Sequence, residues 1–279
     1  MPAQGAGMII EPAAPEEFLA LMQETYGSAM SRAEFDWWFD GNPAGPRILN
    51  VARDGAALGA LSMHFARLDN GLCAFAVHAV TTPASRGRGV FSTLELHNEQ
   101  EAAAAGAQWA LGFTNPMAGP ILVGKLGWED LTSLRIWVRP KSLRKAGRVE
   151  QTAIAPRPRT LPSHHIVRDD AYLRWRYADS PRPYAQSEQA IVTFRQWHGL
   201  PSAIVCEHGR GLNRALRHVQ AQIAVAMVNP GEERRFLAHG FVPTPRTIRF
   251  IGKRLTEDAP ELPKRRSAWH FTLGDLDFF

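Results

Sequence analysis

A glycine-rich loop between an apolar run and a helix constrains the fold of this chain more than any other feature. The apolar run at residues 72–82 predicts a strand. From Val90 onward, residues recur at helical spacing until Gly106, a residue suited to end a helix. The loop at residues 85–89 therefore follows a strand and opens a helix. In that setting a glycine-rich sequence carries information about function.

The loop offers the groups that a pyrophosphate needs. Backbone N–H groups at a helix N-terminus have no intrahelical acceptor and lie at the positive end of the helix dipole. Gly87 and Gly89 allow a tight turn and a close approach to phosphate oxygens, and Arg86 and Arg88 add positive charge. The spacing excludes a dinucleotide fingerprint, which needs GxGxxG, and a Walker loop, which needs GKS or GKT.

The rest of the first half alternates helices and strands. Expected helices cover residues 15–26, 31–40, 90–106 and 118–126, and expected strands cover residues 47–53, 57–67, 72–82, 109–114 and 128–138. Asp54-Gly55 predicts a tight hairpin turn between the first two strands. This order predicts an α+β fold with a mixed, mostly antiparallel central sheet flanked by helices.

The second half repeats landmarks of the first. Residues 33–37 with Pro43 correspond to residues 171–175 with Pro181, and Asn115-Pro116 corresponds to Asn229-Pro230. We expect two related domains, residues 1–139 and 164–279, joined by a Pro-rich basic linker at residues 140–163. The second domain should be reduced by about a strand and part of a helix, with strands at 190–195, 202–207, 222–228 and 247–253.

Composition limits the cellular compartment and the kinds of partner that we expect. Lys and Arg exceed Asp and Glu by 32 to 27, a dispersed excess typical of a solvated surface, so we expect no nucleic-acid partner. Cys73 and Cys206 show no metal-ligand spacing, which predicts neither a metal site nor a disulfide framework. No apolar run has the length of a membrane span, and residues 1–10 lack a signal-peptide pattern. We expect a cytoplasmic protein without a membrane partner.

Residues 80–92 resemble motif A of the GNAT superfamily of acetyl-CoA-dependent N-acetyltransferases, which reads Q/R-x-x-G-x-G/A. Arg86 and Gly89 match it, whereas Phe91 replaces the last small residue. Asn115 at a strand end, and the string Lys125-Leu126-Gly127-Trp128, which is similar to the family's K-x-G-F/W signature, extend the likeness over residues 48–139.

The resemblance implies a cofactor and the residues that hold it. Acetyl-CoA, or another acyl-CoA, would lie as co-substrate in a gap between the strand of residues 78–82 and the strand ending at Asn115. Its pantetheine would bond backbone near Val80 and Thr82, and Asn115 would line the same cleft. The pyrophosphate would bind the loop formed by Arg86, Gly87, Arg88, Gly89, Val90, Phe91 and Ser92.

The reaction of this family is attack of a neutral amine on a thioester, which calls for a proton acceptor and an acid for the thiolate. Many members carry a Tyr four residues before the Gly of the K-x-G-F/W signature, where this chain has Val123. His78 is the candidate catalytic residue, because imidazole titrates near neutrality and His78 should share a strand face with Val80. The competing interpretation is a strand histidine satisfied by a neighbour; His64 is a weaker candidate.

Three functions stay open on the sequence. The first is an N-acyltransferase that moves an acetyl group from acetyl-CoA to a primary amine of a small molecule, by direct attack in a ternary complex. The second is a non-catalytic acyl-CoA sensor, favoured by Val123. The third is a cell-wall aminoacyl transferase of tandem fold, which residues 86–92 argue against. A monomer or homodimer is expected.

The second half contains two weaker features. Gly209-Arg210-Gly211 opens a helical segment and faintly repeats the first loop, as a degenerate copy would. Residues 269–277 have the pattern of a final strand with an acidic end, where Asp275 and Asp277 could face an amine substrate but more often form a turn.

Overall fold

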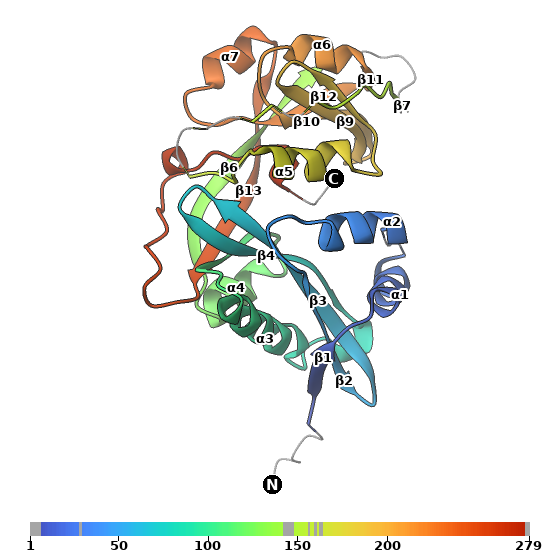
Figure 1. The fold of residues 1–279 in the computed structure, drawn as a ribbon, viewed down its shortest axis with the longest axis vertical. Coiled ribbons are helices and arrows are strands. Elements are labelled where there is room, and N and C mark those ends of the chain that lie inside the picture. The colour runs from blue at the N-terminus through green and yellow to red at the C-terminus, as the bar shows by residue number, and fades with distance from the viewer. Residues whose placement is uncertain are drawn as a thin grey trace. The chain divides into compact units, whose positions relative to one another are not determined.

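The computed structural model describes residues 7–27, 30–141, 148–155, 157–158, 161 and 164–276 (Figure 1). Its α-helices are α1 (Pro15–Tyr26), α2 (Arg32–Phe35), α3 (Val90–Ala104), α4 (Gly119–Lys125), α5 (Asp170–Leu173), α6 (Leu212–Arg217) and α7 (Glu233–Ala238). Its strands are β1 (Ile9–Pro12), β2 (Ile48–Asp54), β3 (Ala56–Leu68), β4 (Gly71–Thr81), β5 (Trp109–Thr114), β6 (Glu129–Pro140), β7 (Arg148–Val149), β8 (Tyr184–Ser187), β9 (Ala190–Trp197), β10 (Leu200–Glu207), β11 (Val219–Gln220), β12 (Ile223–Met227) and β13 (Val242–Arg254). In this described part of the chain, no helix has both the length and the apolar character of a membrane span.

Two compact units interleave along the sequence. The first contains the chain up to Gly112 together with residues 116–129 and 251–262, and the second contains residues 113–115, 130–250 and the segment from Pro263 onward. These units differ from the expected ranges 1–139 and 164–279. The difference arises because β6 pairs antiparallel with β12, with Ile136 opposite Met227, while β13 contributes its last residues to the first unit.

The first unit is built on strands in the order β1-β2-β3-β4-β5. All neighbours are antiparallel except β4 and β5, which run parallel. Helix α3 packs its Val90 and Leu94 on one face, against Leu61 and Met63 of β3. Helices α1 and α2 lie on the other face (Figure 1), where Phe18, Phe35 and Phe39 form an aromatic cluster. The expected α+β architecture, a mixed sheet flanked by helices, is confirmed.

The second unit contains the strand order β6-β12-β10-β9-β8. Its core joins these strands to α6 and α7 through apolar side chains that include Val192, Val205, Leu216 and Phe236. Strand β10 pairs parallel with β12, as β4 does with β5 in the first unit. Of the expected linker, β7 pairs with β11, and Thr152 bonds the backbone of Tyr184 and Gln186, so residues 148–155 pack within this unit.

The same order of elements occurs twice. A capped helical turn runs into a five-residue π-helical turn, η1 (Asp36–Asp40) in the first unit and η3 (Arg174–Ala178) in the second. Three strands, a helix, a strand, a helix and a strand follow in both halves, with the two-residue strand β11 added after α6 in the second. The expected loss of a strand is wrong, because β8 retains it at four residues. The reduction lies in shorter elements instead, chiefly α6 with six residues against fifteen in α3.

The expected final strand at residues 269–277 is also wrong over its described part. Thr272 and Asp275 form a capping box around a short 3-10 turn, Leu273–Asp275, and this local bonding replaces a ladder. Asp275 is buried and pairs with Arg168 at 2.6 Å, so it does not face a substrate. Asp277 lies outside the described residues.

Candidate functional site

The parallel strands β4 and β5 pair over three residues only. Cys73, Ala74 and Phe75 lie opposite Trp109, Ala110 and Leu111, and within these fully described strands no pairing continues beyond them. Strand β4 runs on to Thr81 along β3 alone. Beyond Phe75, β4 therefore has no strand partner on the β5 side, although the Tyr26 hydroxyl donates to the Ala79 carbonyl at 3.0 Å and the Ser62 hydroxyl to the Val77 carbonyl at 2.8 Å.

A β-bulge at His78 accompanies this separation. Leu61 lies opposite Ala79 and Ser62 opposite Val77, so His78 is the extra residue of β4. Its φ of 46° is left-handed, which is uncommon for a residue with a side chain. Such bulges re-aim a strand and often lie beside functional sites.

The loop after β4 is held by its own hydrogen bonds. The Thr82 hydroxyl donates to the Ser85 hydroxyl at 2.8 Å, and the Ser85 amide donates to the Thr82 carbonyl at 2.9 Å. Thr82 itself is anchored to β3, because its amide donates to the Leu58 carbonyl at 3.0 Å. These bonds fix the chain just before the glycines.

Both glycines of the loop adopt left-handed backbone and border open space. Gly87 has φ of 79° and Gly89 has φ of 80°. A Cβ atom built on either residue would meet nothing within 4 Å. Glycine is therefore required here by conformation rather than by packing, and the surface above the loop is open to a ligand.

Helix α3 begins directly at this open surface. Gly89 is its N-cap, and Thr93 is the first residue whose amide reaches back, to the Gly89 carbonyl at 3.0 Å. The amides of Val90, Phe91 and Ser92 precede any intrahelical acceptor. Val90 and Phe91 direct their side chains into the apolar clusters of the unit, so the loop presents backbone donors rather than those side chains.

The two loop arginines have different surroundings. Arg88 donates to the Asp54 carboxylate at 2.9 Å, an ion pair between half-exposed side chains. Arg86 is exposed on the same loop. The Asp54 partner was missed from the sequence, where Asp54 was read only as a turn residue.

The candidate catalytic residues occupy aromatic or apolar surroundings. The His78 ring lies 6.5 Å from Phe18 and 6.0 Å from Phe39, on the face covered by α1 and α2. His64 is buried between Trp38 and Phe75, with ring centroids 5.0 and 5.7 Å away. Val123 packs beside Leu122 and Trp128. His78 stays the predicted catalytic residue, and Asn115, an exposed residue of the second unit, stays a predicted ligand contact.

A buried acid on α3 was also missed. Glu95 is fully buried, and neither of its carboxyl oxygens has a hydrogen-bond partner among the described residues. Burial, reinforced by the charge of Glu99, raises the pKa of Glu95 to about 8. The helical pattern of α3 gave no sign of it, because a single Glu on an amphipathic helix is normally assigned to the solvent face.

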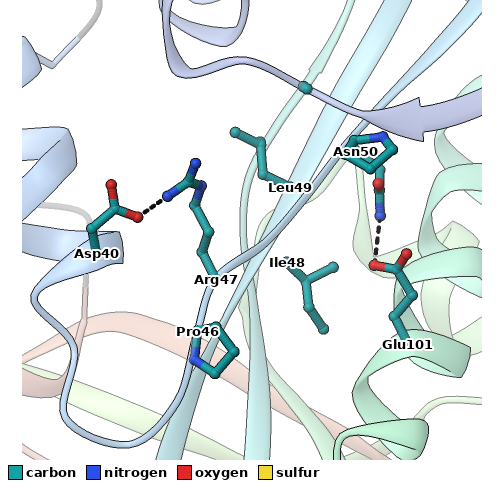
Figure 2. A pocket seen from close by; sticks show the side chains of 9 residues that line it. Asp40, Pro46, Arg47, Ile48, Leu49, Asn50 and Glu101 are labelled. Carbon is teal, nitrogen blue, oxygen red and sulfur yellow. Dashed lines mark hydrogen bonds and ion pairs between the residues drawn. The ribbon is translucent and has the colours of Figure 1, made fainter.

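One hollow of the first unit lies apart from the loop. Pro46, Ile48 and Leu49 line it together with the pairs Arg47–Asp40 and Asn50–Glu101 (Figure 2). Its polar groups bond one another, and no residue of the loop 85–92 contributes to it.

The corresponding loop of the second unit, His208–Gly211, packs against the β8–β9 turn at both of its glycines, although Arg210 is exposed and a hollow opens beside the loop. Gly211 is the left-handed N-cap of α6, as Gly89 is of α3, yet a Cβ on Gly211 would lie 2.2 Å from the Ser187 carbonyl oxygen. A Cβ on Gly209 would lie 2.2 Å from the Gln189 Cβ. The amides of Gln189 and Ala190 donate to the Arg210 carbonyl. The β8–β9 turn thus occupies the surface that is open in the first unit.

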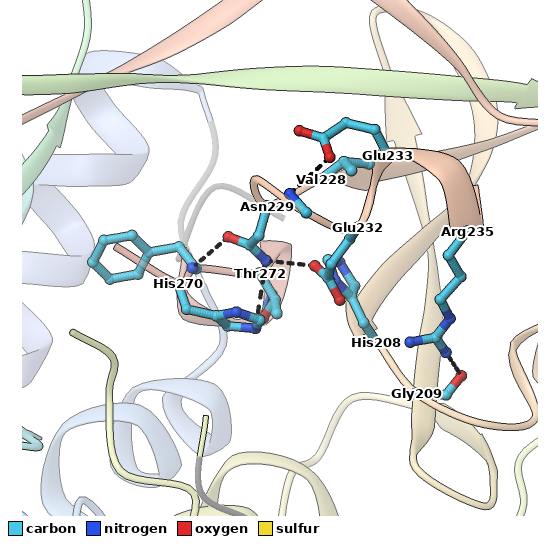
Figure 3. Close-up of polar contacts among 12 residues, drawn as sticks. His208, Gly209, Val228, Asn229, Glu232, Glu233, Arg235, His270 and Thr272 are labelled. Carbon is cyan, nitrogen blue, oxygen red and sulfur yellow. Dashed lines mark hydrogen bonds and ion pairs between the residues drawn. The ribbon is translucent and has the colours of Figure 1, made fainter. Parts of the chain in front are cut away.

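Asn229, the second-half counterpart of Asn115, is buried in a polar network (Figure 3). Its side-chain oxygen accepts from the Phe271 amide and from Arg266, each at 3.0 Å, and its Nδ2 donates to Glu232 at 2.9 Å. His208 and His270 complete the cluster. Burial, and next the neighbouring His208, lowers the pKa of His270 to about 3. No sequence pattern predicts this cluster, because its members come from three segments that lie far apart along the chain.

Solved structures similar to this chain are acetyltransferases or probable acyltransferases at low identity. A GCN5-related N-acetyltransferase from Anabaena variabilis aligns with a TM-score of 0.58 and 13% identity, over 90% of this chain and 73% of that one. A probable N-acyltransferase from Enterococcus faecalis gives 0.59 and 10%, over 89% and 73%. A putative acetyltransferase from Pyrococcus horikoshii gives 0.56 and 12%, over 94% and 92%. No protein-family model matches the sequence, and no curated protein is detectably similar to it.

Proposed function

We propose, from the premise that this chain has the fold of the GCN5-related N-acetyltransferases, that it transfers an acyl group from acyl-CoA to a primary amine of a small molecule. One observation carries the proposal: an open loop with two left-handed glycines at the start of α3, directly after a strand whose outer edge is unpaired. Acetyl-CoA is the donor we expect.

The loop supplies the groups for the pyrophosphate. The amides at the start of α3 point out of the helix end, where the dipole favours negative charge. Arg86 adds an exposed cation beside them. Arg88 is partly neutralised by Asp54, so the backbone donors and Arg86 provide most of the attraction.

The unpaired edge of β4 supplies the groups for the pantetheine. A pantetheine arm carries two amides, which can extend the ladder in place of a strand by bonding the backbone between Phe75 and Thr82. The thioester would then lie near the bulge, where a backbone N–H can stabilise the oxyanion. The amine attacks the carbonyl carbon, the tetrahedral intermediate collapses, and CoA leaves as the thiolate.

His78 is the proposed acceptor of the amine proton. It is the extra residue of the bulge, and a bulge position is displaced from the regular alternation of the strand. Its aromatic surroundings limit access of water to the ring. Val123 offers no proton, so the leaving thiolate would take its proton from water or from the His78 imidazolium that has accepted the amine proton.

A non-catalytic acyl-CoA sensor is the second candidate, favoured by the apolar packing of Val123 at the position where the family often has a Tyr. Both candidates need the loop, and only one needs turnover. The cell-wall aminoacyl transferase of tandem fold would normally use charged tRNA rather than CoA, so acyl-CoA binding at residues 86–92, if measured, would argue against it.

Calorimetry with acetyl-CoA tests the donor site. Gly89→Glu places a carboxylate at the helix end and should weaken binding about 100-fold, or about 2.7 kcal/mol. Gly106→Glu is the matched control, because Gly106 is left-handed, borders open space and lies at the opposite end of α3. It should bind acetyl-CoA as the wild type does. Absence of wild-type binding, or equal effects of the two variants, contradicts the assignment.

Release of CoA thiol, measured with a panel of primary amines, then distinguishes an enzyme from a non-catalytic sensor. Turnover with at least one amine is expected, and binding without turnover favours the sensor. His78→Ala should lower kcat while leaving the Kd for acetyl-CoA unchanged, with the largest loss at the acidic end of the pH profile, where a replacement base is scarcest. An unchanged pH profile removes His78 from the reaction.

A further inference from the structure

Three potential metal ligands converge in the second unit from segments far apart in the sequence. His208 follows β10, Glu232 immediately precedes α7, and His270 belongs to the C-terminal segment. One ligand atom from each side chain lies within 4.8 Å of the others. From this geometry we propose that His208, Glu232 and His270 bind one divalent transition-metal cation, with Zn²⁺ the best fit.

The distances suit a metal with a small adjustment. His208 Nδ1 and Glu232 Oε2 are 3.1 Å apart. Two ligands of a tetrahedral Zn²⁺, each about 2.1 Å from the metal, are separated by about 3.4 Å. This first pair already has the separation that a shared cation requires. The His270 ligand atom lies within 4.8 Å of the other two, so it has to approach them by at most about 1.4 Å to reach the same separation.

Asn229 fixes the orientation of the cluster from outside it. Its side-chain oxygen is occupied by the Phe271 amide and by Arg266, so its Nδ2 must face the other way, toward Glu232 at 2.9 Å and His270 Nε2 at 3.4 Å (Figure 3). A carboxylate ligand held by an outer amide is the usual arrangement around protein metal sites. The same bonds keep the Arg266 guanidinium on the far end of Asn229.

The charge around the cluster is balanced. Arg235 donates to the Gly209 carbonyl beside His208, and Arg168 is buried and forms ion pairs with the carboxylates of Asp275 at 2.6 Å and Glu207 at 3.2 Å. These two acids offset its charge. The ligand set then adds one carboxylate and two imidazoles, a combination that favours Zn²⁺ and related borderline cations over Mg²⁺ or Ca²⁺, which prefer oxygen ligands.

The site would fasten the C-terminal segment to the unit. His270 is the only one of the three ligands from that segment, and the described residues around it form no strand pairing beyond the single bridge between Trp269 and His164. A cation shared with His208 and Glu232 would tie the segment to the ends of β10 and β12. Three protein ligands leave a fourth tetrahedral position for water.

Cobalt spectroscopy tests the proposal. The untagged full-length chain, stripped with a chelator, is titrated with Co²⁺ and then with Zn²⁺. We expect visible d–d bands that saturate at one Co²⁺ per chain and disappear on addition of one equivalent of Zn²⁺. His270→Ala and Glu232→Gln should each weaken Co²⁺ binding at least 100-fold, and Glu232→Gln preserves the shape of the side chain in case the alanine variant fails to fold.

His218→Ala is the matched control. His218 also pairs with a glutamate, Glu150, at 3.2 Å, but that pair is more exposed and outside the cluster. The control should bind Co²⁺ as the wild type does, and the melting temperature of both should rise with Zn²⁺. A wild-type chain that shows no d–d bands overturns the proposal and leaves a hydrogen-bonded network only. Equal losses in His218→Ala and His270→Ala overturn it as well.

Discussion

The loop at residues 86–89 and the loop at residues 208–211 differ in what covers them. Both follow a strand that pairs parallel with its neighbour, and both end in a left-handed glycine that caps a helix. Gly87 and Gly89 border open space, whereas Gly209 and Gly211 touch the β8–β9 turn. The same local backbone is therefore available to a ligand in one unit and used for packing in the other.

The shortening of the second unit explains the difference. With α6 only six residues long and β8 only four, the β8–β9 turn lies against the loop, and Gln189 bonds Arg210 from above. Asn229 is likewise buried beneath the C-terminal segment, while Asn115 is exposed. A repeated element order thus predicts shared geometry, but the contacts of each copy decide whether that geometry can bind.

A large difference in stability should result from replacing with alanine the glycine that caps each helix, Gly89 for α3 and Gly211 for α6. Gly211→Ala brings a Cβ to 2.2 Å from the Ser187 carbonyl oxygen and adds left-handed strain, so we expect a loss of about 4 kcal/mol in the free energy of unfolding. Gly89→Ala adds the strain alone, about 1 kcal/mol. Urea denaturation measures both. Similar losses for the two variants would break the comparison.

A second difference concerns buried acids. Glu207 in the second unit bonds Tyr177 and Arg168, whereas Glu95 in the first has no such partner among the described residues. The pKa of Glu95 is about 8 in the folded chain against 4.5 in the unfolded one. The protonated Glu95 therefore makes its full contribution to the free energy of unfolding below pH 4.5, and this contribution is lost as the pH rises through 8.

Glu95→Gln should remove that pH dependence. We expect the stability of the variant relative to the wild type to increase by up to about 5 kcal/mol between pH 4.5 and pH 9, because the pKa of Glu95 rises from 4.5 to about 8 on folding. Glu24→Gln, on the exposed part of α1, is the control and should leave the profile unchanged. Urea denaturation at several pH values provides the measurement. Parallel profiles for wild type and Glu95→Gln would contradict the assignment of Glu95 as a buried neutral acid.

The smallest effect is that of the loop arginines on the affinity for acetyl-CoA. Arg86→Gln should weaken acetyl-CoA binding about fivefold, or about 1 kcal/mol, and less at high salt, because an exposed cation is screened. Arg210→Gln in the second loop should have no effect on binding. Calorimetry at two ionic strengths distinguishes the loops. A loss of affinity in Arg210→Gln would show that the second loop also attracts the ligand.

The first half could be predicted closely from its sequence. The predicted helix at residues 15–26 and the predicted strand at residues 109–114 match the structure, because Pro15 starts the helix and Gly106 separates α3 from β5. The Asp54-Gly55 turn was right, since Gly55 is left-handed as a tight hairpin requires. Residues such as proline and glycine mark the ends of these helices, strands and turns, and the first half contains many of them.

The misses come from contacts distant in sequence. β8 follows Pro181 and Pro183 and is only four residues long. A segment this short cannot show the two-residue alternation of apolar and polar side chains, so no strand is predicted there. Residues 269–276 alternate like a strand, but the Thr272 capping box and the Arg168 ion pair hold them in a turn. The His208, Glu232 and His270 cluster and the buried Glu95 exist only once the chain has folded.

Hydrogen–deuterium exchange with and without acetyl-CoA tests the difference between the loops most directly. The account predicts that acetyl-CoA slows amide exchange across residues 86–93 and leaves residues 208–215 unchanged, because the glycines of the first loop border open space whereas those of the second pack against the β8–β9 turn. Slowed exchange at residues 208–215, or no change at residues 86–93 under saturating acetyl-CoA, would contradict it.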